Sequence, residues 1–156
     1  MRMVNSMQTA RSRAAEALKA VLHQVSQVKL HTIDLPDPDL KIDIVAHVDV
    51  HGHRRTLVCK VKASGRPEHV LVALEELQGL ANQIDGDATP VIIAPHLSEE
   101  AKALCGERRA GFLDLAGNAR IDLGDVFIFR RTLAQHSRHS STTMSNREDE
   151  ELAGVA

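Results

Sequence analysis

The hydrophobic and polar positions between residues 42 and 62 alternate with the two-residue period of a β-strand. One face of the first stretch, IDIVAHVDV at 42–50, consists of Ile42, Ile44, Ala46, Val48 and Val50. Residues 51–53 read HGH, and Gly52 can adopt the positive φ of a tight turn. The stretch TLVCKVK at 56–62 follows as a return strand. The pattern therefore predicts an antiparallel β-hairpin.

Two longer segments have the spacing of amphipathic helices. Residues 67–84 begin with Pro67, which suits the first turn of a helix, and continue with apolar residues spaced to pack on a sheet. Ser98 can cap a third, shorter helix, because acidic residues follow it directly. The first helix is expected over residues 10–30, where the helically spaced apolar residues are Leu18, Val21, Leu22, Val25 and Val28.

Short apolar runs complete the pattern. PVIIAP at 90–95 is wholly apolar, as in a buried central strand, and a helix joins it to the strand at 56–62, so we expect these two strands to be parallel. Residues 33–41 form a proline-containing loop with room for one short edge strand. Three closing strands are expected at 111–115, 119–123 and 126–131. The sequence thus predicts an α/β fold, a mixed β-sheet flanked by helices on both faces.

The composition changes near residue 134, where the sequence becomes polar, rich in Ser and Thr, and loses its periodicity. Segments that cannot bury an apolar face stay disordered. The 156 residues are therefore expected to divide into one domain at 1–133 and a disordered tail at 134–156.

Charge and composition narrow the function classes. The net charge is −2, which excludes a chain that is basic throughout but leaves room for a local basic groove. Phe112, Phe127 and Phe129 are the only aromatic residues, so base-stacking folds of the RRM or OB type are not favoured. No secretory h-region and no apolar run of about 18 residues is present, which predicts a cytoplasmic protein. Cys59 and Cys105 are expected to be buried thiols.

The predicted hairpin brings chemically useful side chains together. A tight turn at 51–53 places Asp43 opposite Lys60 or Lys62, and the alternation puts both lysines on one face of the return strand. A carboxylate can hold a divalent metal ion that polarises a phosphate and activates water. A lysine can orient the nucleophile or offset developing charge. This end of the hairpin is therefore a candidate site for phosphodiester chemistry.

The stretches IDIVAHVDV, LVCKVKASGRP and EHVLVALEELQGLANQI resemble the core of the PD-(D/E)XK restriction-endonuclease-like superfamily, over about residues 40–95. By position, Asp43 matches the first Asp of the family motif and Lys62 matches its Lys. The acidic position of the motif falls on Lys60, which reverses its charge. The stretch GFLDLAGNARIDLGDVFI also resembles a segment that follows this core in some bacterial members.

The resemblance implies a possible repair of the incomplete motif. In some branches of the superfamily the second carboxylate lies on the following helix, about fourteen positions after the Lys, and Glu76 occupies that position here. The implied site consists of Asp43, Lys62 and Glu76 as catalytic residues, with Asp43 and Glu76 holding Mg²⁺. The implied substrate is DNA, contacted by Lys60, Arg54 and Arg55. Members of the superfamily often act as homodimers, and the apolar stripe of the first helix is a candidate interface.

Two functions of different classes follow. One is a Mg²⁺-dependent DNA endonuclease with a migrated site; the other is a catalytically inactive DNA-binding or protein-interaction module on the same fold. The partner of Lys60 and the orientation of Glu76 distinguish them. A regulatory, antitoxin-like partner is a third and weaker interpretation. His47, His51 and His53 resemble a metal cluster by count, but no Cys or acid completes a tetrahedral zinc set.

Overall fold

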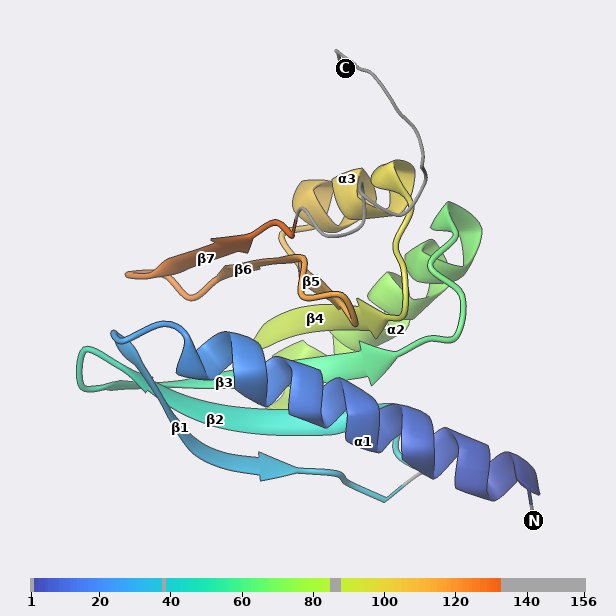
Figure 1. Cartoon of the computed structure of the whole chain (residues 1–156), viewed down its shortest axis with the longest axis horizontal. Helices are drawn as coiled ribbons and strands as arrows, with labels where there is room; N and C mark the ends of the chain where they lie inside the picture. Colours follow the sequence, from blue (N-terminus) through green and yellow to red (C-terminus); the bar gives the residue numbers. More distant parts are fainter. Residues whose placement is uncertain (1, 38, 85–87, 133–156) are drawn as a thin grey trace.

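The structure, a computed structural model, describes residues 2–37, 39–84 and 88–132. Seven strands form one sheet whose spatial order follows the chain, and three helices pack on it (Figure 1). The helices are α1 (Arg2–His23), α2 (Pro67–Ile84) and α3 (Glu99–Glu107). The strands are β1 (Val28–Asp34), β2 (Ile44–Val50), β3 (His53–Val61), β4 (Thr89–Ala94), β5 (Gly111–Asp114), β6 (Ala119–Asp122) and β7 (Phe127–Arg130). The predicted tail at 134–156 lies outside the described residues.

The sheet is mixed, as predicted. Strands β1, β2 and β3 are antiparallel, β3, β4 and β5 are parallel, and β5, β6 and β7 are antiparallel again. The parallel pairs are joined by α2 and α3, because parallel neighbours need a crossover connection. The antiparallel hairpin of β2 and β3 and the parallel pairing of β3 with β4 are both confirmed.

Two apolar cores lie on opposite faces of the sheet. The first lies under α1 and reaches from Leu18 and Leu22 of the helix to Ile121 and Ile128 in the last two strands. Figure 1 shows α1 running across β2 and β3, with β1 below the helix and the β6–β7 hairpin above it in this view. The second core lies under α2 and α3 and contains Leu74, Leu77, Ile92 and Cys105, among others. Helices therefore cover both faces, and the predicted α/β class is confirmed.

The apolar stripe of α1 is used inside the chain. Ala14, Leu18, Val21 and Leu22 are all buried against the sheet. Their proposed role as a dimer interface was therefore wrong, because the same side chains cannot cover a second copy. Formation of a homodimer itself stays a prediction.

Strand β1 differs from the sequence-based expectation, which extended the first helix to residue 30. The helix ends at His23, and β1 pairs with β2 from Val28 opposite Val50 to Asp34 opposite Val45. A register shift between Leu30 and Thr32 interrupts this edge. Apolar residues three positions apart in this segment fit a helix. Its backbone groups instead form hydrogen bonds with β2, and these bonds outweigh the local preference for a helix.

The loop between β3 and α2 passes very close to the segment before α3. The Ser98 amide donates to the Gly65 carbonyl at 3.1 Å, and a Cβ atom at Gly65 would overlap the carbonyl oxygen of His96. Ser98 also caps α3 as predicted, since its side chain accepts from the Ala101 amide at 3.1 Å. Gly65 thus fixes how the two connections cross. None of the helices in the described part of the chain is long and apolar enough to cross a membrane.

We expect the substitution Gly65→Ala to lower the free energy of unfolding by about 2–3 kcal/mol, because backbone must move to admit the methyl group. Gly79→Ala is the matched control: it lies within α2 with open space around it, and alanine should raise stability by about 0.5–1 kcal/mol. Urea denaturation of both variants measures the difference. Equal stability of the two variants would contradict the close approach.

Candidate functional site

The main candidate site is a hollow of about 170 Å³ at the carboxyl ends of β3 and β4, on the face covered by α1. We call it the Asp43 hollow. Its polar lining consists of Arg11, Arg13, Asp43 and Lys62. Apolar side chains, including Ile93 and Leu115, form the rest of the wall. The carboxyl ends of parallel strands are where ligands bind in open α/β sheets, so this position is a natural candidate.

Asp43 is held by a buried arginine from α1. Arg11 is 6% exposed, and its Nη2 donates to the Asp43 carbonyl oxygen at 2.9 Å and to the Pro36 carbonyl oxygen at 2.6 Å. Its Nε lies 3.6 Å from Oδ1 of Asp43. The other carboxylate oxygen of Asp43 accepts the Val61 amide at 2.7 Å. The charge of Asp43 is therefore offset by a guanidinium that has little access to water.

Strand β3 presents no second ligand beside Asp43. Cys59 belongs to the core under α1 and Val61 packs against it, whereas Val58 belongs to the core on the other face. Burial, together with the nearby Asp43 carboxylate, raises the pKa of the Cys59 thiol, so the sulfur stays protonated. A protonated thiol and a valine cannot share a metal ion with Asp43.

Lys60 and Glu76 form an ion-pair cluster with Lys41, in which Glu76 comes from α2. The Nζ of Lys60 lies 3.2 Å from Oε1 of Glu76, and the Nζ of Lys41 lies 3.7 Å from Oε2. The hydrogen bond and charge of Lys60, followed by the charges of Lys41 and Lys62, lower the pKa of the Glu76 carboxyl. Glu76 is thus ionised and satisfied by lysines.

The three residues expected to form one cleft are not all brought together. Asp43 and Lys62 line the same hollow, but Glu76 does not. Asp43 is held by an arginine of α1, and Glu76 by a lysine that points to α2. The expected pair of carboxylates for Mg²⁺ is therefore absent from the hollow, and its remaining lining, one acid among three cations, does not fit a divalent cation.

The other two predicted DNA contacts, Arg54 and Arg55, lie against residues of the same chain. The Nε of Arg54 donates to Asp49 at 2.8 Å, and this bond lowers the pKa of the Asp49 carboxyl. The guanidinium of Arg55 lies against Gly124 in the β6–β7 turn. His47 shares a hydrogen bond of 3.1 Å with Thr56. Within residues 2–37, 39–84 and 88–132, no three His, Cys, Asp or Glu side chains are grouped so as to hold a metal ion.

Sequence reasoning missed Arg11, the residue that determines the state of Asp43. A signal was present, because Arg11 lies three, four and seven positions before Ala14, Ala15 and Leu18, and therefore on the apolar face of the helix. A charged residue on such a face requires a buried partner. Only the fold shows that the partner is Asp43.

No protein-family model matches the chain, and no curated protein matches it. Among solved structures, a repair endonuclease from Pyrococcus abyssi aligns at 15% identity and a TM-score of 0.46, over 69% of this chain and 46% of its own. EndoMS in its apo form aligns at 15% identity and a TM-score of 0.42, over 65% and 45%. An XisH family protein from Nostoc punctiforme aligns at 12% identity and a TM-score of 0.39, over 67% and 92%. The chain thus spans less than half the length of the first two.

Proposed function

We propose that this chain is a DNA-binding module on a restriction-endonuclease-like scaffold, and that it does not hydrolyse DNA by the metal-dependent route. The observation that carries the proposal is the ion pair between buried Arg11 and half-buried Asp43, with a separation of 3.6 Å between Nε and Oδ1. The order of the elements and the resemblance of residues 40–95 to the PD-(D/E)XK core support the choice of scaffold.

The absence of hydrolysis follows from the charges of the hollow. A metal-dependent nuclease needs carboxylates that attract a divalent cation to the scissile phosphate. In the Asp43 hollow the single carboxylate already has an arginine and a backbone amide as partners. Arg13 and Lys62 add two further positive charges to the lining. At close range these cations repel a metal ion.

The same charges favour a phosphate. Guanidinium and ammonium groups are the usual ligands of the DNA backbone, and together they contribute most of the sequence-independent affinity. Arg13 is exposed and Lys62 half-buried at the mouth of the hollow, so both can reach a phosphate oxygen. With three cations and one paired carboxylate in its lining, the hollow suits an anion better than a divalent cation. Pairing of two copies on one duplex belongs to the proposal and is testable by light scattering.

Wild-type protein with Mg²⁺ or Mn²⁺ is expected to leave supercoiled plasmid DNA uncut. Asp43→Ala is expected to lower the free energy of unfolding by about 2–3 kcal/mol, because it leaves the Arg11 guanidinium buried without its partner. The double variant Arg11→Leu/Asp43→Ala should lose less free energy of unfolding than the two single variants lose in sum. Cleavage by the wild type that Asp43→Ala abolishes without loss of folding would overturn the proposal in favour of the nuclease.

Substitution of the exposed cations tests binding. We expect Arg13→Ala and Lys62→Ala each to weaken binding of a DNA duplex and to reduce the slope of log K against log salt by about 0.9, the value for one lost phosphate contact. Lys19→Ala is the matched control, since Lys19 lies on the same helix and pairs with Glu16 at 3.0 Å. Fluorescence anisotropy at several salt concentrations measures the slope. Identical slopes for all three variants would exclude the Asp43 hollow as a DNA contact.

In this proposal Glu76 is the ion-pair partner of Lys60 and Lys41. The pH dependence of protein stability tests this role. A carboxyl with a lowered pKa stabilises the fold above its unfolded pKa, and that contribution is lost as pH falls through the folded pKa. Glu76→Gln should therefore lower stability slightly at neutral pH, by about 0.2–1 kcal/mol as for other exposed pairs, and not in strong acid. Thermal melts of both proteins across pH provide the measurement, and a loss of DNA binding in Glu76→Gln would contradict a purely structural role.

A further inference from the structure

Two of the three aromatic side chains in this protein are exposed, and they are neighbours. Phe127 is 53% exposed and Phe129 is 60% exposed, whereas Phe112 is 7% exposed. Both exposed residues belong to β7, the last strand of the sheet, and alternate positions of a strand point to the same side. Ile128 between them is buried in the core under α1. The two rings thus face outward together on the side of α3.

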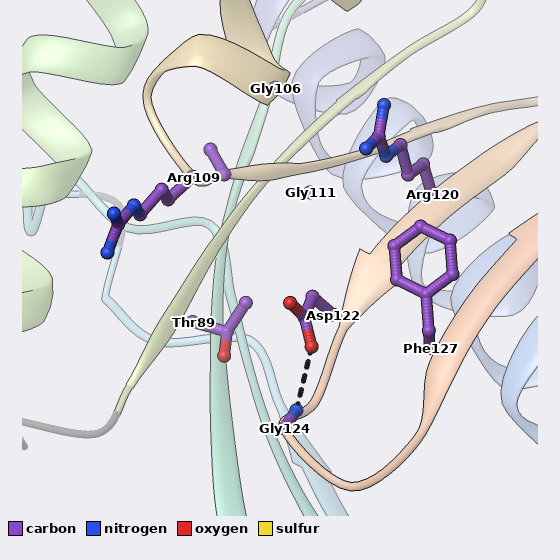
Figure 2. A pocket seen from close by; sticks show the side chains of 9 residues that line it. Thr89, Gly106, Arg109, Gly111, Arg120, Asp122, Gly124 and Phe127 are labelled. Atoms are coloured by element: carbon purple, nitrogen blue, oxygen red, sulfur yellow. Dashed lines mark hydrogen bonds between the residues drawn. The ribbon is translucent and has the colours of Figure 1, made fainter.

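Cations surround the two rings. A hollow of about 400 Å³ is lined by Phe127, Arg109 and Arg120, and Figure 2 shows Arg120 beside the Phe127 ring, whereas the Arg109 guanidinium points away from it. The Cζ of Arg120 lies 5.4 Å from the centre of that ring. A second hollow of about 260 Å³ contains Phe129 and the cations Lys102, Arg120, Arg130 and Arg131. Arg120 lines both hollows, so they form one continuous surface, which we call the Phe127–Phe129 surface.

The charge of this surface is mostly uncompensated. Its acids are Asp122, which accepts the Gly124 amide at 2.9 Å, and Glu99, which pairs with Lys102 at 3.1 Å. In the part of the chain that the structure describes, the four arginines of the surface, Arg109, Arg120, Arg130 and Arg131, make no ion pair. A protein with a net charge of −2 therefore concentrates positive charge around its two exposed rings.

The backbone at Arg109 is a further feature of this surface. Arg109 has a φ of 57°, in the left-handed region that glycine adopts with the least cost after a helix. A residue with a side chain is strained at such a position. Arg109 lines the hollow that contains Phe127, with its guanidinium directed away from the ring. The strained backbone therefore forms part of the hollow, while Arg120 is the cation next to the Phe127 ring.

We propose that the Phe127–Phe129 surface binds single-stranded nucleic acid, with bases stacked on the two phenylalanine rings and phosphates bound by the arginines. Exposed rings next to a cationic groove are the combination that single-strand binders use. Base faces are available only in a single strand, because in a duplex they are covered by neighbouring bases. An acidic peptide would match the charge but gives the rings no planar partner. This surface lies on the face of α3, away from the Asp43 hollow, and the inference is independent of the proposed function.

The test is the affinity for a labelled oligothymidine of about twelve nucleotides, a length within the range of single-strand sites. Fluorescence anisotropy compares the wild type with Phe127→Ala/Phe129→Ala, in which two stacking partners are lost. The expected weakening is about 30-fold or more, from stacking contributions of at least about 1 kcal/mol per base. Arg120→Ala should also weaken binding and reduce its salt dependence. The control is Val72→Ala, which removes an exposed apolar side chain from α2 and should leave the affinity unchanged.

Three further measurements make the outcome decisive. Phe129→Leu keeps an apolar side chain without a ring, so it should weaken binding if stacking is the cause. A polyglutamate peptide of the same charge should compete poorly; equal competition, or unchanged affinity in the double phenylalanine variant, would overturn the proposal and favour an acidic peptide partner. Arg13→Ala and Lys62→Ala should leave oligothymidine binding unchanged while weakening duplex binding. A failure at either surface is therefore distinguishable from a failure at the other.

Discussion

The guanidinium of Arg11 is the interaction on which the candidate site depends. It comes from α1, is nearly inaccessible to water, and donates to the carbonyl oxygens of Pro36 and Asp43. It therefore fixes the helix, the connection after β1 and the start of β2 relative to one another. Removing the Asp43 carboxylate would leave the Arg11 guanidinium buried without a charged partner, which costs more than an exposed pair contributes. The packing of α1 therefore also determines the charge beside Asp43, because the same arginine contributes to both.

Under the proposed function, the scaffold lacks metal chemistry and keeps its fold. The hairpin of β2 and β3 and its parallel neighbour β4 remain intact, because their stability comes from apolar residues such as Ile44, Leu57 and Ile93 on the face under α1. The site residues lie at the strand ends, where substitution affects charge more than packing. Function on such a scaffold is determined by the few groups at that edge.

The two surfaces differ in the chemistry that they offer. The Asp43 hollow is small, partly apolar and lined by three cations and one acid, and under the proposed function it binds a phosphate at the carboxyl ends of the parallel strands. The Phe127–Phe129 surface lies beside α3 and adds flat aromatic groups to its cations. A protein with both could contact paired and unpaired segments of one nucleic acid, since the two surfaces lie on opposite faces of the sheet.

The sequence by itself determined the periodic elements: the hairpin, α2 with its boundaries at Pro67 and Ile84, the Ser98 cap and the parallel strand β4 all follow from spacing and capping chemistry. The sequence did not determine to which face of the sheet each charged side chain points. Ile42 and Ile44 belong to opposite cores, so the alternation breaks at Asp43, and the acid turns toward α1 while Lys60 turns toward α2. A break of one residue at a strand end exchanges the faces, and only packing against the helices decides it. Tertiary structure therefore assigned Arg11 to Asp43 and Lys60 to Glu76.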